Sequence, residues 1–66
     1  MNQTELGQRI RRARERIGMS QEKFAEEAGL HRTYVSDLEL GSRNPSISII
    51  QKLATALRVS AGELLD

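Results

Sequence analysis

Apolar residues recur near the start of the chain with the period of an amphipathic helix. Their separations of four, three and four residues place them on one helical face. The residues of this face are Leu6, Ile10, Ala13 and Ile17. Thr4 is a suitable N-cap and Gly18 a suitable stop, so we expect the helix to lie between them, with residues 1–3 frayed.

Two shorter helices joined by a tight turn are predicted for residues 21–40. Ser20 is expected to cap the first of them, because its hydroxyl can accept from the unpaired amides of the first turn. Met19 and Phe24 flank this cap at the spacing of a hydrophobic staple. Gly29 is expected to end the helix, since a left-handed conformation strains glycine least.

The second short helix is predicted to span residues 32–40, with His31 as its N-cap and Gly41 at its end. Val35 and Leu38 are expected to face the core, because they share one side of the helix. The opposite side and its flanks carry Arg32, Thr33, Ser36, Asp37 and Leu40. The four polar side chains of this set have the length and chemistry to reach base edges, although a solvated helix face shows the same pattern.

A fourth helix is predicted after Ser46, and a fifth, barely one turn long, after Ser60. The fourth helix carries an apolar stripe, with Ile49 off its centre. The stripe consists of Ile47, Ile50, Leu53, Ala54 and Leu57. Leu64 and Leu65 cannot both face inward on so short a helix, so we expect one of them to meet a partner.

The composition is that of one small domain spanning residues 1–66, with no cysteine and a single histidine. A chain of this size has a small core, so oligomerisation is the remaining route to more buried surface. Neither a disulfide nor a thiolate metal site is available, and we expect no metal and no cofactor. No apolar run reaches the length of a membrane span and no signal-peptide core is present, so we expect a cytoplasmic protein without membrane contact.

The net charge of +1 says little, but charge is unevenly distributed. Arginines crowd the predicted first helix, whereas acidic residues gather in the second. The arginines are Arg9, Arg11, Arg12, Arg14 and Arg16, and the acids are Glu22, Glu26 and Glu27. A nucleic-acid binder needs a local basic surface rather than a basic total, although a charge run is more often only a solvated face.

The two short helices place a small residue, a glycine and two inward aliphatics at Ala25, Gly29, Val35 and Leu38. This arrangement resembles the helix-turn-helix of the lambda-repressor/Cro-like family. The run from Gly29 to Glu39, with Gly41 and Arg43–Asn44 after it, more particularly resembles the controller proteins of restriction–modification systems. Helix-turn-helix antitoxins and phage-type repressors share much of this pattern and are the alternatives.

The resemblance covers nearly the whole chain and implies an all-α, compact five-helix lambda-repressor-like domain, with the helix-turn-helix at helices 2 and 3. It implies a DNA-binding transcriptional regulator that reads the major groove with residues 32–40. Arg32 is expected to donate to O6 and N7 of a guanine, because its planar fork matches both acceptors. The residues expected to reach bases are Arg32, Thr33, Ser36 and Asp37, although a nearby arginine could hold Asp37 instead. Those expected at the DNA backbone are Gln21, Tyr34, Arg43 and Asn44.

The resemblance also implies contacts within the protein and between copies. Arg14 is expected to pair with Glu39 and so clamp the first helix to the third. Arg58 stands where the family commonly has glycine, which predicts a strained left-handed residue or a different helix stop. A homodimer reading two half-sites is expected, with an interface at Ile49, Leu64 and Leu65. The resemblance implies an operator near the protein's own gene, with RNA polymerase as a further partner if the protein is an activator.

The outer face of the predicted third helix argues against a protein-interaction module that does not touch DNA. Such a module would have a hydrophobic or strongly acidic face there, whereas only Leu40 is apolar. An enzyme is not expected, because the chain has no glycine-rich phosphate loop, metal cluster or nucleophile beside a base. His31 is interpreted as a helix cap or phosphate neighbour, since it would lie on one exposed helix with no pocket for a substrate.

Overall fold

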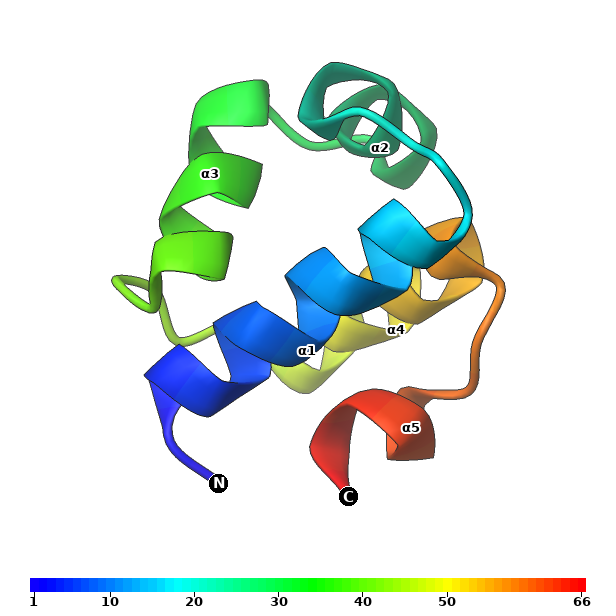
Figure 1. Ribbon diagram of the computed structural model, residues 1–66. Helices are drawn as coiled ribbons and strands as arrows, with labels where there is room; N and C mark the ends of the chain where they lie inside the picture. Colours follow the sequence, from blue (N-terminus) through cyan, green and yellow to red (C-terminus); the bar gives the residue numbers. More distant parts are fainter.

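Five α-helices form the regular structure in the computed structural model, which describes residues 1–66. They are α1 (Gln3–Arg16), α2 (Gln21–Ala28), α3 (Arg32–Leu40), α4 (Ile47–Leu57) and α5 (Ala61–Leu65). Figure 1 shows α1 crossing in front of α4, with α2 and α3 on one side and α5 and both termini on the other. The predicted all-α, five-helix fold is confirmed, with the helix-turn-helix at α2 and α3.

Serine caps and left-handed residues set most helix boundaries, as predicted. Ser20, Ser46 and Ser60 each accept a hydrogen bond from the backbone amide three residues later. Gly29 and Gly41 adopt positive φ angles of 70° and 83° and end α2 and α3. These bonds satisfy amides and carbonyls that a helix end leaves unpaired, so the local sequence fixes where each helix starts and stops.

Two caps differ from the predictions. Asn2, not Thr4, caps α1, because its Oδ1 accepts from the Glu5 amide at 2.7 Å. Asparagine is a stronger N-cap than threonine, and its earlier position extends the helix to Gln3, so the predicted fraying of residue 3 is wrong. His31 holds the N-cap position of α3 but makes no capping hydrogen bond through its side chain.

The core consists of apolar side chains from all five helices. Its largest fully buried members are Phe24, Ile10, Leu38, Leu53, Leu57, Leu64 and Val35. The inward positions of Val35 and Leu38 are therefore confirmed. Two positions that the periodicity placed in apolar stripes are instead exposed, because Ile17 and Ile47 lie at helix ends, where the neighbouring helices no longer cover the stripe.

The last helix resolves the choice between Leu64 and Leu65. Leu64 is 1% exposed and belongs to the core, so its predicted place in a dimer interface is wrong for this fold. Its burial follows from the contacts of α5 with both α1 and α4, which turn this side of the short helix inward. Leu65 remains 39% exposed. Arg58, which precedes this segment, has a φ of 61°, so the left-handed alternative predicted for it is the one observed.

Gly7 allows α1 and α3 to approach each other closely. A Cβ atom at this position would overlap the carbonyl oxygen of Leu38 and lie 2.8 Å from that of Glu39. Both neighbours are backbone atoms of α3, so they could move only with the helix. The packing of α3 on α1 therefore requires glycine at position 7, a role that the sequence alone does not reveal.

Candidate nucleic-acid interface

The turn between α2 and α3 sets the orientation of α3 relative to α2 and the core. Gly29 and Leu30 close the end of α2, and the Leu30 amide donates to the Ala25 carbonyl at 2.8 Å. Leu30 packs against the core, which anchors the corner. Val35 and Leu38 then bury the inner side of α3, leaving its opposite side at the surface of the molecule. Figure 1 shows α3 at the edge of the molecule, where no other helix covers its outward side.

The outer face of α3 presents the side chains that the sequence selected as base contacts. Arg32 and Thr33 are exposed in the first turn, and Ser36 and Asp37 are half-buried in the next. Leu40 is 74% exposed at the C-terminal end. The structure thus brings the four candidate base contacts onto one surface, with the most accessible of them at the N-terminus of the helix.

A buried ion pair holds α3 from behind. Arg14 donates to Glu39 through Nε at 2.7 Å and through Nη2 at 3.0 Å, and its Nη1 donates to the Met19 carbonyl at 2.8 Å. The two charged side chains are only 11% and 4% exposed. This is the pairing that the resemblance implied. The hydrogen bonds that Arg14 donates to the Glu39 carboxylate raise the pKa of Arg14 above its usual value, which favours the charged form of the arginine.

Gln21, an expected DNA backbone contact, takes part in the same network. Its Nε2 donates to Oε1 of Glu39 at 3.0 Å, which connects the first residue of α2 to the last full turn of α3. One N–H of this amide is thereby used within the protein, and the other can still donate to a phosphate. The network joins α1, α2 and α3 and leaves no buried side-chain nitrogen or oxygen without a partner.

The loop after α3 folds back onto that helix. Arg43 donates to Oδ2 of Asp37 from Nε at 3.4 Å and from Nη2 at 3.3 Å. The guanidinium carbon of Arg43 also lies 5.3 Å from the centre of the Tyr34 ring. Asn44, the other loop residue expected at the DNA backbone, is exposed. Of the two alternatives for Asp37, the free protein therefore has the one in which an arginine holds the carboxylate.

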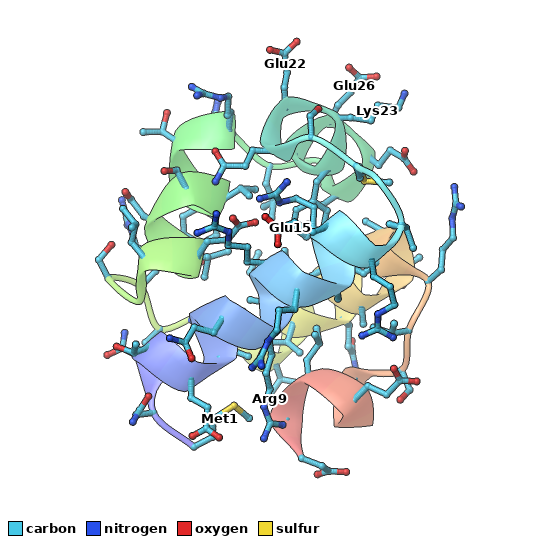
Figure 2. All side chains as sticks on the ribbon, viewed as in Figure 1. Met1, Arg9, Glu15, Glu22, Lys23 and Glu26 are labelled. Carbon is cyan, nitrogen blue, oxygen red and sulfur yellow. The ribbon has the colours of Figure 1, made fainter.

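Three of the five arginines of α1 are paired with a carboxylate, whereas Arg12 and Arg16 are exposed and make no ion pair. Arg9 pairs with Glu5 at 3.3 Å, Arg11 pairs with Glu15 at 3.1 Å, and Arg14 is buried as described. Arg9 lies beside Glu63 and Leu64 of α5, whereas Figure 2 shows Glu22 and Glu26 projecting into solvent from α2. Positive charge on α3 itself and in the loop after it comes from Arg32 and Arg43.

A second surface, on the side of the two termini, exposes three large apolar side chains. Met1, Ile47 and Leu65 are 55%, 63% and 39% exposed. They surround a hollow that Leu6, Pro45 and Ile50 also line, together with the polar residues Asn2 and Asn44. Ile49, predicted at a dimer interface, lies elsewhere, half-buried against the core beside Tyr34 and Arg43. The sequence analysis assigned neither Met1 nor Ile47 to an interface, because it expected Met1 in a frayed end and Ile47 in the core stripe of the fourth helix.

No group of three or more histidine, cysteine, aspartate or glutamate side chains is arranged to hold a metal ion. None of the five helices combines the length and the apolar character needed to cross a membrane.

Comparison with known proteins gives a consistent assignment. Residues 10–64 match a family model described as Helix-turn-helix. The chain is 51% identical over 62 residues to the control protein C.BamHI of Bacillus amyloliquefaciens, which covers 92% of this chain and 76% of that protein. It matches the crystal structure of the restriction-modification controller protein C.AhdI of Aeromonas hydrophila with a TM-score of 0.90 and 48% identity over 92% of each chain.

A third similar protein has been solved with DNA bound. It is SinR, described as the master regulator for biofilm formation, and it matches with a TM-score of 0.88 and 40% identity, over 92% of this chain and 98% of that one. The resemblance found in the sequence is thereby confirmed at the level of the family and of the controller proteins. The chain belongs to the helix-turn-helix family.

Proposed function

We propose that this protein is a sequence-specific DNA-binding transcriptional regulator, acting in the cytoplasm as the controller protein of a restriction–modification system. The observation that carries the proposal is the outer face of α3, where exposed Arg32 and Thr33 stand on a helix fixed from behind by the buried Arg14–Glu39 pair. A base-reading helix must be held rigidly, because small displacements break hydrogen bonds to base edges. The similarity to C.BamHI and C.AhdI supports the controller role.

Base reading is assigned to the N-terminal half of α3. In a helix-turn-helix, the N-terminal residues of the second helix contact base edges in the major groove. Arg32 would donate two hydrogen bonds to a guanine, while Thr33 and Ser36 would contact neighbouring bases or a thymine methyl group. Asp37 is the remaining candidate for a base, as an acceptor from a cytosine amine.

Backbone contacts would come from residues on α2, on α3 and in the loop after α3. Gln21 lies at the N-terminus of α2, where free backbone amides and the helix dipole favour a phosphate. Tyr34 lies on the recognition helix, and Arg43 and Asn44 lie in the loop that follows it. Contacts of this kind fix the register of the protein on DNA but do not select a sequence.

A homodimer would bind two half-sites about one helical turn apart. The apolar surface of Met1, Ile47 and Leu65 supports this, since three large apolar side chains are exposed around one hollow. Of the interface residues expected from the sequence, Leu65 belongs to this surface, whereas Ile49 lies outside it. Sedimentation should show a dimer at micromolar concentration, and Ile47→Asp should shift it to monomer. A strict monomer at every concentration, free and on DNA, would exclude the dimer.

Selection of bound sequences from random DNA tests the proposal as a whole. We expect a motif with two-fold symmetry, and we expect that motif to occur upstream of the protein's own gene. If the protein activates transcription from this operator, RNA polymerase becomes a further partner. Recovery of no enriched sequence at low salt would contradict sequence-specific binding and favour a protein-interaction module.

A further inference from the structure

Arg43 does not project away from the end of α3 but lies back along the helix. Ser42 starts this return, because its amide and its Oγ both bind the Asp37 carbonyl at 3.0 Å. The guanidinium of Arg43 then reaches the Asp37 carboxylate and the Tyr34 ring. Tyr34 and Asp37 are three residues apart on a helix, so they share the side of α3 on which Arg43 lies.

The contacts leave one edge of the guanidinium free. Asp37 occupies the edge formed by Nε and Nη2, and both donors bind the same carboxylate oxygen. The other edge, formed by the two terminal nitrogens, has no partner within the protein. The Arg43 side chain is 53% exposed, so an incoming ligand can reach it. A pair of parallel N–H groups is the arrangement that binds two oxygens of one phosphate.

We propose that Asp37 and Tyr34 position Arg43 for a DNA phosphate, so that Asp37 acts through Arg43 and reads no base itself. This inference rests on the proposed function. A flexible arginine loses rotamer freedom when it binds, and an arginine that is already held loses less. Holding it also offsets the repulsion between the Asp37 carboxylate and the phosphates nearby.

Two other roles for Asp37 give different results. If Asp37 accepts from a cytosine amine, its loss changes the preference at one base pair whether or not Arg43 is present. If Asp37 only competes with DNA for Arg43, its loss frees the arginine and strengthens binding. If Asp37 instead positions Arg43, loss of Asp37 weakens DNA binding, because Arg43 then contributes less to the affinity.

The experiment is a double-mutant cycle on DNA affinity with Asp37→Asn, Arg43→Ala and the combined variant, using the selected operator and its single-base variants. We expect Asp37→Asn to weaken DNA binding by about fivefold more in the wild-type background than in the Arg43→Ala background. This difference is a coupling free energy of about 1 kcal/mol. The base preference should stay unchanged. The salt dependence of DNA affinity in Asp37→Asn should fall towards that of Arg43→Ala, because Arg43 then neutralises a phosphate less well. This fall is expected even though the substitution removes a negative charge from the protein.

Glu26→Gln is the matched control. It also removes one carboxylate from an exposed ion pair, with Lys23, but on the outer side of α2. It should show no coupling to Arg43→Ala. Thermal unfolding of each variant checks the fold, and the ¹⁵N-edited signal of the Arg43 Nε–H should shift in Asp37→Asn and not in Glu26→Gln.

Three results would overturn the inference. They are additive effects in the cycle, a coupling of the opposite sign, and an altered base preference in Asp37→Asn. Failure of the proposed function looks different, because the wild-type protein would then select no DNA sequence at all.

Discussion

Asp37 and Glu39 lie two residues apart on α3, yet their ion pairs have different surroundings. Glu39 and its partner Arg14 are 4% and 11% exposed, whereas Asp37 and its partner Arg43 are 33% and 53% exposed. The buried pair is shorter, at 2.7 Å against 3.3 Å, and Gln21 adds a further hydrogen bond to it. The helix therefore has a fixed inner side that sets its position and an accessible outer side whose charges remain available to a ligand.

The difference shows how burial decides what an ion pair does. Removing one partner from a buried pair leaves a charge that neither water nor protein compensates. An exposed pair is solvated with or without its partner, so it adds little to stability. Two acidic residues of one helix thus have different settings in this domain: Glu39 belongs to a buried ion pair, and Asp37 belongs to an exposed one on the face proposed to bind DNA.

The largest expected effect comes from breaking the inner pair. Glu39→Gln should lower the free energy of unfolding by ~3 kcal/mol or more, because Arg14 stays buried and charged. Asp37→Asn is the matched control on the same helix and should cost under about 1 kcal/mol. Urea unfolding of both variants, with a double-mutant cycle between Arg14 and Glu39, measures the contrast. Equal losses, or no coupling between Arg14 and Glu39, would remove the distinction between the two sides.

A smaller loss of stability is expected at Gly7, where the inner side of α3 packs against α1 with no room for a side chain. Gly7→Ala should destabilise the protein by about 1–3 kcal/mol, since the added Cβ meets backbone oxygens of α3. Gly62→Ala is the control, because its Cβ would lie 3.3 Å from a side-chain oxygen of Asp66, near the end of the chain, and no backbone atom is close. Thermal unfolding compares the two. If Gly7→Ala were as stable as the wild type, α3 would be free to shift on α1.

The smallest effect on stability, and one of opposite sign, is expected at Arg58, which lies at the end of α4 and not on α3. Arg58→Gly should stabilise the protein by up to roughly 1 kcal/mol, because Arg58 ends α4 with a φ of 61°. Because Arg58 makes no ion pair, this variant measures the contribution of backbone strain to stability separately from that of the ion pairs. A clear loss of stability in denaturant would show that its charge at the end of α4 outweighs the strain.

The sequence predicted features that depend on a few adjacent residues. Caps at Ser20, Ser46 and Ser60 and stops at Gly29 and Gly41 follow from local hydrogen bonding and backbone freedom, and all five are observed. The same reasoning placed the first cap at Thr4, whereas the structure has it at Asn2, which is the better capping residue of the two.

Features that depend on contacts between helices were less accessible. Periodicity could not tell which of Leu64 and Leu65 faces the core, since a helix of barely more than one turn has no clear face. It also could not show that α3 would need Gly7, or that Ile47 would remain uncovered at the end of α4. For the site, residue types identified the outer face of α3, but the return of Arg43 onto Asp37 and Tyr34 depends on a loop conformation.

The central claim is that the outer side of α3 reads DNA sequence, and Arg32 tests it most directly. Binding of the wild type, Arg32→Ala and Arg43→Ala should be measured on the selected operator and its single-base variants at several salt concentrations. Arg32→Ala should cost ~1–3 kcal/mol on the operator and relax the preference at one base pair in each half-site. Arg43→Ala should weaken all sequences about equally and lower the salt dependence by about one unit per subunit. If Arg32→Ala weakened every sequence alike and left the base preference intact, Arg32 would be a phosphate ligand, and the account of base reading would be wrong.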